Sequence, residues 1–380
     1  MTSFYIGIAF IFTWFQNHIH EPKDNQLSLL FIGDIMGHGP QIKAAFNDSS
    51  KTYSYENMFK YIKEEVSDAD FTIANLEVTL AGKPYQGYPQ FSSPDALALA
   101  CKNNGIDGFV MANNHSCDRG SDGISRTIDV VEKLNLLHTG TFKNKNTRDS
   151  LNLMILNKNN IKVGILNYTY GTNGLPFADP TYVNLIDTAL ISKDILEAKK
   201  TDIDKLIVFI HWGKEYKEQP DNFQINTARF LFSKKVDVII GSHPHVLQKM
   251  IYVPIKESQD KQNESFIVYS MGNYVSNQRD RRKDGGCMVK LILEKNEEKV
   301  NIKECGYLLT WVYKKVVGKK IDYHVLPCSK FENDSIFFEK KENYSKMKLF
   351  IDDSRALFKE NNLSVKEYIY QDSSWTINNN

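Results

Sequence analysis

Residues 236–245 read VDVIIGSHPH, an apolar run that ends in a glycine and is followed by two histidines on either side of a proline. Similar apolar runs at residues 29–32, 71–74, 109–112 and 206–210 also end in polar or histidine residues. Short apolar runs bounded by turn residues are typical of buried strands. In an open α/β sheet, ligands bind beyond the carboxyl ends of the strands. The sequence therefore predicts that loops distant in the chain converge on one site.

Helix-like and strand-like segments alternate over the first 240 residues. Apolar residues have helical spacing at 55–66, 95–104, 124–137, 192–200 and 223–233. A hairpin is expected at 151–167, where Lys158, Asn159 and Asn160 separate two strand-like stretches. After residue 250, strand-like stretches follow one another without a long helix, at 250–253, 266–270, 286–293, 300–307 and 321–326. We therefore expect an α/β protein with a second, largely antiparallel layer packed on the first sheet.

Bulk composition excludes several classes of protein. The chain has 380 residues, of which 42% are hydrophobic and 24% are charged, as is usual for a globular protein. The formal net charge of +1 argues against a broadly basic surface, so no nucleic-acid partner is expected. The 5 cysteines are odd in number and lack CxxC spacing, which excludes a complete disulfide framework and disfavours a zinc–cysteine site.

Three regions are expected along the chain. Residues 1–26 contain an apolar run at 4–15, which is too short for a transmembrane helix of about 20 residues but suits a signal peptide or an anchor. No Lys or Arg precedes this run, so a buried helix and a cytoplasmic location stay open as alternatives. Residues 27–330 are expected to form the main domain. Residues 331–380 are expected to form a polar tail, helical near 346–358.

Residues able to bind a divalent cation follow the expected strands. Carboxylate, amide and imidazole groups together suit an ion such as manganese, iron or zinc. Each residue alone has an ordinary structural explanation, such as an Asx turn for Asp34 or a satisfied buried side chain for His211. Five of the 9 histidines fall in these motifs, and this joint pattern favours one shared site for one or two metal ions. The candidate ligands are Asp34, His38, Glu77, Asn114, His211, His243 and His245.

His115 is the candidate proton donor of this site. It follows Asn114 at a strand exit, and Asp118 lies three residues further on. A histidine can act as a general acid toward a leaving oxygen, and a nearby carboxylate can orient it and hold its protonated form. Turn chemistry with one hydrogen-bonded histidine is the alternative. Cys117 raises a further alternative, a thiol nucleophile, although a small buried cysteine is the commoner explanation.

Substrate-binding residues are expected in the same motifs and in two aromatic loops. The loops at 82–93 and 168–184 are long and rich in Tyr, Pro and Gly, which favours a functional role. A basic stretch ends the strand-like run near residue 270, and its guanidinium groups suit phosphate or carboxylate, unless the run is simply a solvated surface. The candidates are Asn75, Tyr88, Asn113, Tyr170, Glu215, Asn273, Arg279 and Arg281.

Six of these stretches together resemble the CapA capsule-synthesis family, which is associated with poly-γ-glutamate and polysaccharide capsules and is related to calcineurin-like metallophosphatases. The stretches are GDIMGHGPQI, ANLEVTL, ANNHSCDRG, HWGKEY, GSHPHVLQ and YSMGNYVSN, and they run in order from Gly33 to Asn277. The resemblance implies an αββα sandwich, with two mixed sheets flanked by helices and a site at one sheet edge.

The resemblance also implies roles for individual residues. Asp34 and His245 would hold one metal, Asn114, His211 and His243 would hold the other, and Glu77 would bridge the two. His115 would be the catalytic acid. The usual Asp-x-His of the phosphatases is Asp34-Ile35-Met36 here, and a thioether is a poor ligand for hard cations, so His38 would have to complete the first metal site.

The function expected from the sequence is metal-dependent hydrolysis of a phosphoester or related bond in an anionic polymer or phosphoester substrate. Metal ions would lower the pKa of water and stabilise the developing anion. The implied biological role is capsule or exopolymer biosynthesis at the cell envelope, with membrane-bound capsule synthesis proteins as possible partners. The alternative is a non-catalytic envelope module that binds a polyanionic polymer in a capsule assembly complex.

Overall fold

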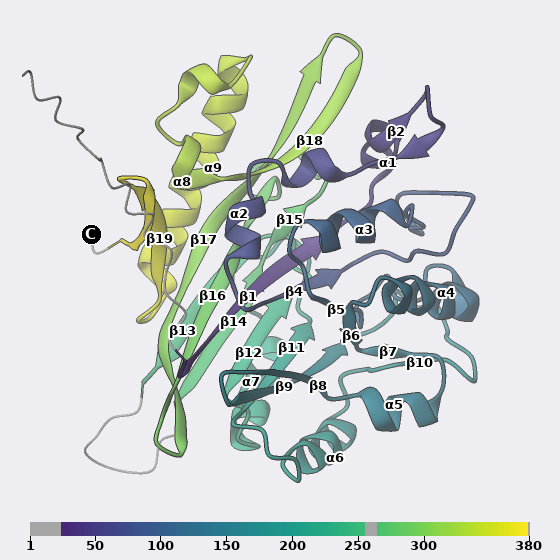
Figure 1. Ribbon diagram of the computed structural model, residues 1–380, viewed down its shortest axis with the longest axis vertical. Helices are drawn as coiled ribbons and strands as arrows, with labels where there is room; N and C mark the ends of the chain where they lie inside the picture. Colours follow the sequence, from purple (N-terminus) through teal and green to yellow (C-terminus); the bar gives the residue numbers. More distant parts are fainter. Residues whose placement is uncertain (1–23, 255–263, 379–380) are drawn as a thin grey trace, which may run out of the picture.

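Two β-sheets stacked face to face form the centre of the computed structural model, which describes residues 24–254 and 264–378 (Figure 1). The larger sheet has ten strands in the order β20-β19-β17-β16-β1-β4-β5-β6, with β15 beside β1 and β18 beside β17. The smaller sheet has six strands in the order β13-β14-β12-β11-β9-β8. Two short pairs, β2 with β3 and β7 with β10, lie outside these sheets.

The strands of the larger sheet are drawn from both ends of the described chain. They are β1 (Gln26–Ile35), β4 (Phe71–Leu76), β5 (Gly108–Val110), β6 (Leu137–Thr139), β15 (Asn273–Val275), β16 (Gly285–Asn296), β17 (Lys299–Val317), β18 (Lys320–Pro327), β19 (Lys366–Gln371) and β20 (Ser374–Ile377). The smaller sheet comes from the middle of the chain. Its strands are β8 (Met154–Lys158), β9 (Ile161–Thr169), β11 (Lys205–His211), β12 (Val238–Ser242), β13 (Leu247–Val253) and β14 (Ser265–Met271). The short pairs are β2 (Phe46–Asn47) with β3 (Thr52–Tyr53) and β7 (Thr141–Phe142) with β10 (Tyr182–Val183).

Helices flank the two sheets on their outer faces. α3 (Ala96–Asn103) and α4 (Gly120–Lys133) pack on the larger sheet, and α6 (Thr188–Ala198) and α7 (Asn222–Ser233) pack on the smaller one. The expected αββα sandwich of two mixed sheets is therefore confirmed. The other helical segments are α1 (Gly39–Ala45), η1 (Glu56–Phe59), α2 (Lys63–Ser67), α5 (Lys145–Leu151), α8 (Cys328–Phe331), η2 (Ser335–Phe337) and α9 (Lys341–Asn361).

The alternation of side chains along β1 shows how the layers are built. Leu29 and Phe31 face the core between the sheets, and Phe31 meets Phe209 of β11 with ring centroids 6.4 Å apart. Leu30 and Ile32 face the opposite way, into the core beneath α3 and α4. Because successive residues of a strand point to opposite faces, a strand buried on both faces is continuously apolar, as this one is.

The parallel strands of both sheets end at the same edge of the sandwich. In the larger sheet β1, β4, β5 and β6 run parallel, and in the smaller sheet β9, β11, β12 and β14 do. The chain passes from one sheet to the other at Gly272, between β14 and β15, and β15 pairs with β1 at Asp34. This crossing ties the carboxyl end of β1 to the edge of the smaller sheet.

The expected separate antiparallel layer after residue 250 is wrong. β13 and β14 complete the smaller sheet, whereas β16, β17 and β18 extend the larger one, where β16 pairs antiparallel with β1. The reason is that β1 has a free edge on the side away from β4, and β16 satisfies its backbone groups there. Antiparallel strands therefore occur in both layers instead of forming one.

Two helical predictions need correction or extension. The helix expected at 55–66 is two short pieces, η1 and α2, although Met58, Phe59, Ile62 and Val66 are all buried as their spacing indicated. Burial of the apolar face, not an unbroken hydrogen-bond ladder, stabilises this segment. The helix expected near 346–358 is the longer α9, which buries residues such as Phe350 in the core between the sheets, and β19 beyond it pairs with β17.

The expected hairpin at 151–167 is confirmed as β8 and β9, with Asn159 and Asn160 in the turn at positive φ. The apolar run at 4–15 and the signal or anchor expected there lie outside the described residues. Within residues 24–254 and 264–378, no helix is both long enough and apolar enough to span a bilayer.

Candidate metal centre

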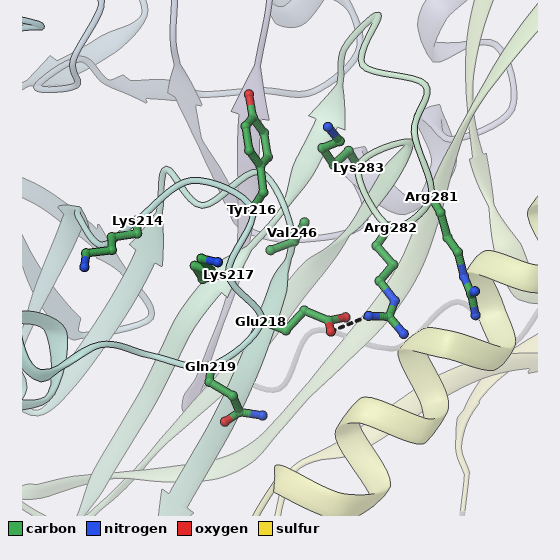
Figure 2. A pocket seen from close by; sticks show the side chains of 9 residues that line it. All are labelled: Lys214, Tyr216, Lys217, Glu218, Gln219, Val246, Arg281, Arg282 and Lys283. Atoms are coloured by element: carbon green, nitrogen blue, oxygen red, sulfur yellow. Dashed lines mark hydrogen bonds and ion pairs between the residues drawn. The ribbon is translucent and has the colours of Figure 1, made fainter.

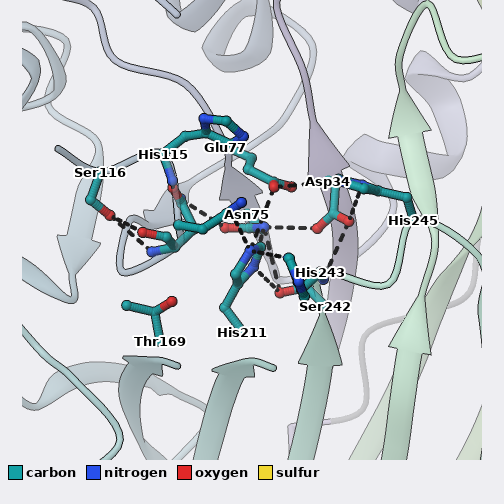
Figure 3. A network of polar contacts seen from close by, with 12 residues as sticks. Asp34, Asn75, Glu77, His115, Ser116, Thr169, His211, Ser242, His243 and His245 are labelled. Atoms are coloured by element: carbon teal, nitrogen blue, oxygen red, sulfur yellow. Dashed lines mark hydrogen bonds and ion pairs between the residues drawn. The ribbon is translucent and has the colours of Figure 1, made fainter. Parts of the chain in front are cut away.

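Side chains from five strand ends meet at the edge where the parallel strands of both sheets finish (Figure 3). Figure 3 shows Asp34, Asn75, Glu77, His211 and His243 turned toward one another. Asp34 is the last residue but one of β1, Glu77 follows β4, and Asn114 follows β5, while His211 ends β11 and His243 follows β12. The predicted convergence of these strand-exit residues is therefore present in the folded chain.

Glu77 lies at the middle of the cluster. Its Oε1 is 3.5 Å from Nε2 of His211 and 3.7 Å from Nε2 of His245. The side chain is fully buried, and neither carboxylate oxygen has a hydrogen-bond partner among the described residues. A buried carboxylate without partners is costly, and a cation would relieve that cost.

Asp34 and His245 form one side of the cluster. Oδ2 of Asp34 lies 3.2 Å from Nδ1 of His245, and Oδ1 accepts a hydrogen bond of 2.8 Å from the side-chain amide of Asn75. Nδ1 of His245 is also 3.1 Å from Oδ1 of Asn273, which comes from β15. Asn75 therefore positions Asp34, and Asn273 positions His245.

His211 forms the other side, together with Asn114 and His243. Nε2 of His211 lies 2.8 Å from Oδ1 of Asn114 and 3.1 Å from Nδ1 of His243. Nδ1 of His211 lies 2.9 Å from Oγ of Ser242. With Nδ1 held by the serine, Nε2 faces the cluster, as is usual for a histidine ligand whose other nitrogen has a protein partner.

Close backbone approaches make these positions possible. A Cβ on Gly33 would lie 2.4 Å from the carbonyl oxygen of Gly272, so only glycine fits where β1 meets the crossing between the sheets. His243 has a φ of 99°, in the left-handed region that a histidine rarely adopts. Such strain costs on the order of 1–3 kcal/mol and is typical of functional sites.

Burial dominates the electrostatics of the cluster. It raises the pKa of Glu77 well above its ordinary value, with the charge of Asp34 adding to the effect. It lowers the pKa of His211 to about 3 and that of His243 well below its ordinary value. Burial would also raise the pKa of Asp34, but the hydrogen bond and charge of His245 bring it below its ordinary value. The imidazoles of His211 and His243 are therefore neutral at pH 7, which is the form that binds metal.

Two overlapping groups of buried ligand atoms fit a divalent cation. One consists of Glu77, His243 and His245, the other of Asp34, Glu77 and His211, and within each group the ligand atoms lie within 4.8 Å of one another. Glu77 belongs to both groups, as expected of a bridging residue. These groups divide the remaining ligands differently from the resemblance, whereas the short contacts of Asp34 with His245 and of His211 with His243 follow it, so the assignment of ligands to each ion stays a prediction. Mixed nitrogen and oxygen donors without cysteine suit zinc, manganese or iron.

Met36 and His38 lie apart from these two groups. Met36 is buried among apolar side chains. His38 precedes α1, where its ring lies 3.1 Å from Oε1 of Gln41 and accepts a hydrogen bond of 3.3 Å from the backbone N–H of Asn277. Burial lowers the pKa of His38 to about 4. Its role as a metal ligand stays a prediction.

His115 and Asp118 form a buried pair beside the cluster. Nδ1 of His115 lies 2.8 Å from Oδ2 of Asp118, and that oxygen also accepts a hydrogen bond of 2.7 Å from the backbone N–H of Phe91. The ring of Phe91 packs edge-on against His115 with centroids 4.6 Å apart. This contact fixes the imidazole through one nitrogen and leaves the other for proton transfer.

Four candidate substrate residues contact the centre, and one of them, Asn273, is the residue that contacts His245. Asn75 bonds Asp34, and Asn113 donates to the carbonyl oxygen of Leu76 at 2.8 Å and to the side chain of Asn75 at 3.3 Å. These asparagines thus support the ligands. Tyr170 is half-exposed, and its ring lies over His243 with centroids 4.6 Å apart. It is the candidate best placed to touch a substrate above the imidazoles.

Four other candidates lie further out. Tyr88 is 74% exposed, and Glu215 is also exposed, in the loop after β11. The Arg279 guanidinium is largely buried and stacks on Trp311 at 5.4 Å, and burial lowers its pKa. Arg281 is exposed and forms a bidentate pair with Asp353 of α9. Substrate binding by these residues stays a prediction.

Sequence reasoning missed several residues that position the centre. Ser242 holds His211 and lies directly before His243, so its place at a strand exit was a usable signal. Asn167 of β9 accepts a hydrogen bond of 2.7 Å from the backbone N–H of Ala112 and thereby fixes the loop that carries Asn114. No local pattern marks a single asparagine inside a strand. Tyr216, whose ring is 6.1 Å from that of His245, was also missed.

Cys117 is a buried free thiol. Burial raises the pKa of this thiol to about 11, so it is protonated at neutral pH. A protonated thiol is a poor nucleophile. The geometry therefore argues against the thiol alternative.

Comparison with known proteins agrees with the motifs. The family model described as "Bacterial capsule synthesis protein PGA_cap" matches residues 28–278. The "Capsule biosynthesis protein CapA" of Bacillus anthracis is 26% identical over 300 residues, which cover 75% of this chain and 69% of that protein. The "PGA biosynthesis protein CapA" of Bacillus subtilis (strain 168) is 28% identical over 305 residues, which cover 76% and 74%.

Similar solved structures include a calcineurin-like phosphoesterase YfkN from Bacillus subtilis, with a TM-score of 0.43 and 12% identity over 87% of this chain and 98% of that one. A 5'-nucleotidase from Candida albicans has a TM-score of 0.40 and 11% identity, over 86% and 58% of the two chains. The family match is the stronger finding, because residues 28–278 include the centre from Asp34 to Asn273. The chain belongs to the PGA_cap family of bacterial capsule synthesis proteins.

Proposed function

We propose that this protein is a metal-dependent hydrolase that acts on a phosphoester or related bond of an anionic substrate in capsule or exopolymer biosynthesis. The observation that carries the proposal is the buried carboxylate of Glu77, which has no hydrogen-bond partner among the described residues and lies between the imidazoles of His211 and His245. That environment is unfavourable for the carboxylate alone and favourable with a cation.

Asp34, Glu77, His211, His243 and His245 would hold one or two divalent ions, with Asn114 as a further oxygen ligand. Bound there, a divalent ion supplies Lewis acidity and lowers the pKa of water. Asn75 and Ser242 keep the ligands in place by hydrogen bonds to Asp34 and His211. The side chains of these five ligands are buried.

His115 would protonate the leaving oxygen. Asp118 accepts the Nδ1–H of His115 at 2.8 Å, which orients the ring. General acid catalysis of this kind typically contributes a factor of about 10²–10⁴ in rate. A module that only binds polymer has no need of such a pair, so His115 and Asp118 favour the enzyme over the non-catalytic alternative.

The biological setting follows from the family. The two Bacillus relatives are named for capsule and PGA biosynthesis, which supports a role in polymer biosynthesis at the cell envelope for this chain as well. The substrate would then be a polyanionic polymer or a phosphoester linked to its synthesis, and membrane-bound capsule synthesis proteins would be natural partners.

Metal content and hydrolysis measured together test the proposal. We expect the purified wild-type protein to bind manganese, iron or zinc and to hydrolyse a phosphodiester or γ-glutamyl substrate when manganese is added. His243→Ala should lose both metal and activity, and His115→Ala should keep the metal and lose activity. His324→Ala is the matched control, because His324 is a buried histidine of β18 outside the cluster. Its Nδ1 lies 2.7 Å from the carbonyl oxygen of Asn57. A metal-free wild-type protein whose activity survives His243→Ala would overturn the proposal. Polymer binding without turnover, unchanged in His115→Ala, would favour the non-catalytic alternative.

A further inference from the structure

Asn273 lies where the crossing between the two sheets meets the metal centre. It begins β15, directly after Gly272, and the parallel register pairs it with Asp34 of β1. Its side chain is fully buried. Buried polar groups are almost always hydrogen-bonded, so both ends of this amide need partners within the protein.

The nitrogen end of the amide faces oxygen atoms. Nδ2 of Asn273 donates to the carbonyl oxygen of Lys283 at 2.8 Å and to Oε1 of Gln278 at 2.9 Å, and the carbonyl oxygen of His245 is a longer contact at 3.4 Å. A backbone carbonyl oxygen can only accept a hydrogen bond. The NH₂ group must therefore point toward Lys283, because the opposite orientation would place two acceptor oxygens against each other.

The loop that supplies this carbonyl oxygen is anchored at several points. It consists of residues 276–284, between β15 and β16. Arg282 of the loop pairs with Glu218 at 2.5 Å, an interaction drawn in Figure 2. The carbonyl oxygen of Asp284 accepts a hydrogen bond of 2.9 Å from the backbone N–H of Val312 in β17. The backbone of the loop is therefore a fixed support for the Asn273 amide.

With the amide oriented in this way, its oxygen faces His245. Oδ1 of Asn273 lies 3.1 Å from Nδ1 of His245, and Oδ2 of Asp34 lies 3.2 Å from the same nitrogen. Both oxygens are acceptors, so these contacts are favourable only when Nδ1 carries a hydrogen atom. A neutral imidazole has a single N–H, and Nε2 therefore keeps its lone pair.

Nε2 of His245 is the nitrogen on the side of the bridging carboxylate. It lies 3.7 Å from Oε1 of Glu77, and Figure 3 shows the ring of His245 beside Asp34. A histidine that binds metal through one nitrogen usually donates the N–H of the other to a protein oxygen, which fixes both the tautomer and the ring orientation. The contact with Asn273 has this arrangement.

We propose that Asn273 is a positioning residue that holds His245 as the Nδ1–H tautomer, so that only Nε2 of this histidine can bind a metal ion. The amide connects the loop at 276–284 with the centre. This role is distinct from the substrate binding expected of Asn273 from the sequence. The inference rests on the proposed function only in requiring a divalent ion at the centre, and it does not depend on hydrolysis.

NMR of the full chain measures the tautomer directly. The histidines are labelled with the NMR-active isotope of nitrogen, and the signals of His245 are identified by their loss in His245→Gln. We expect the hydrogen atom on Nδ1 in the metal-free wild type, and the same with zinc bound through Nε2. A hydrogen atom on Nε2 in the metal-free protein, or zinc bound through Nδ1, would overturn the inference.

Three substitutions separate positioning from a merely structural role. Asn273→Ala should allow the Nε2–H tautomer to appear and should weaken zinc affinity about 10- to 100-fold in a metal titration, as is typical when a ligand loses its hydrogen-bond partner. Asn273→Asp keeps an acceptor oxygen and should keep the Nδ1–H tautomer. Asn104→Ala is the matched control, because Asn104 is also buried but bonds the carbonyl oxygen of Ala100 at 2.8 Å, outside the cluster. It should change neither the tautomer nor the affinity.

Each result bears on one claim. An unchanged tautomer and zinc affinity in Asn273→Ala, or equal losses of affinity in Asn273→Ala and Asn104→Ala, would contradict the positioning role. If Asn273→Ala does not fold, the wild-type spectra still decide which nitrogen carries the hydrogen atom. A wild type that has the Nδ1–H tautomer and binds zinc but hydrolyses nothing would contradict only the proposed hydrolase. An active hydrolase with the hydrogen atom on Nε2 of His245 would contradict only this inference.

Discussion

The Glu77→Gln substitution is expected to raise the free energy of unfolding without metal and to lower it, relative to the wild type, when metal is added. In the metal-free protein, Glu77 is fully buried and its carboxylate oxygens have no hydrogen-bond partner among the described residues, and its pKa is raised by burial and by Asp34. Burying a charged group without a partner costs several kcal/mol, on the order of 3 kcal/mol, and the raised pKa of Glu77 reflects this cost. Glutamine avoids this cost but buries an amide, which offsets about 1–2 kcal/mol. Metal-free Glu77→Gln should therefore be more stable than the wild type by about 1–2 kcal/mol.

Metal should reverse the order of the two proteins. A ligand at a hundred times its dissociation constant stabilises the folded state by about 2.7 kcal/mol. The wild type should gain this amount with manganese, and Glu77→Gln should gain little, because Glu77 belongs to both ligand groups. Urea unfolding at pH 7, with EDTA and then with manganese, measures both free energies of unfolding.

Glu65→Gln is the matched control for this experiment. Glu65 is also buried, but it pairs with Lys330 and accepts a hydrogen bond of 3.2 Å from Trp375. Its substitution should destabilise the protein by about 2 kcal/mol with or without metal. A metal-free Glu77→Gln protein that is destabilised to the same extent, or one that gains as much from manganese as the wild type, would refute the reasoning.

Three further substitutions probe the support of the site and the fold. Ser242→Ala removes the partner of Nδ1 of His211 and should weaken metal affinity about 10- to 100-fold without unfolding the protein, as measured by metal titration. Gly33→Ala should lower the free energy of unfolding by about 1–3 kcal/mol, because the added Cβ would lie 2.4 Å from a carbonyl oxygen. Gly39→Ala, where a Cβ meets nothing within 4 Å, should show no such loss in the same urea titration. Burial lowers the pKa of His138. Below about pH 6.5 the unfolded chain therefore binds a proton that the folded chain does not, and the free energy of unfolding decreases as the pH is lowered. His138→Gln should make this fall shallower by up to about 1.4 kcal/mol per pH unit, and an unchanged slope would contradict the assignment.

Much of the metal centre could be predicted because each ligand lies at the end of a buried strand or within a few residues after it. Asp34, Glu77, Asn114, His211 and His243 all occupy such positions, and parallel strands of one sheet bring their carboxyl ends to one edge. Local sequence therefore contains both parts of the inference, the apolar run and the polar residue after it. The layered fold could be predicted for the same reason, since strand-like and helix-like patterns alternate.

The strand partners could not be predicted from these patterns. A stretch such as 286–293 is identified as a strand by its composition, but nothing within it indicates whether it pairs with β1 or with β14. The pairing depends on which strand has an unsatisfied edge in the folded core, and here that strand is β1. Residues such as Asn167 were missed for a similar reason, because their function lies in a contact with a loop far away in sequence.

The placement of the arginines depends on the same kind of long-range contact. Arg279 and Arg281 are two residues apart in one basic stretch, yet one stacks on Trp311 and the other pairs with Asp353 of α9. The stretch lies in the loop between β15 and β16, where no regular period fixes the direction of a side chain, and the partners come from β17 and α9. The metal ligands themselves are divided between the sheets, with Asp34 and Glu77 on the larger and His211 on the smaller. The centre therefore exists only while the core between the sheets, including the contact of Phe31 with Phe209, holds the two layers in register.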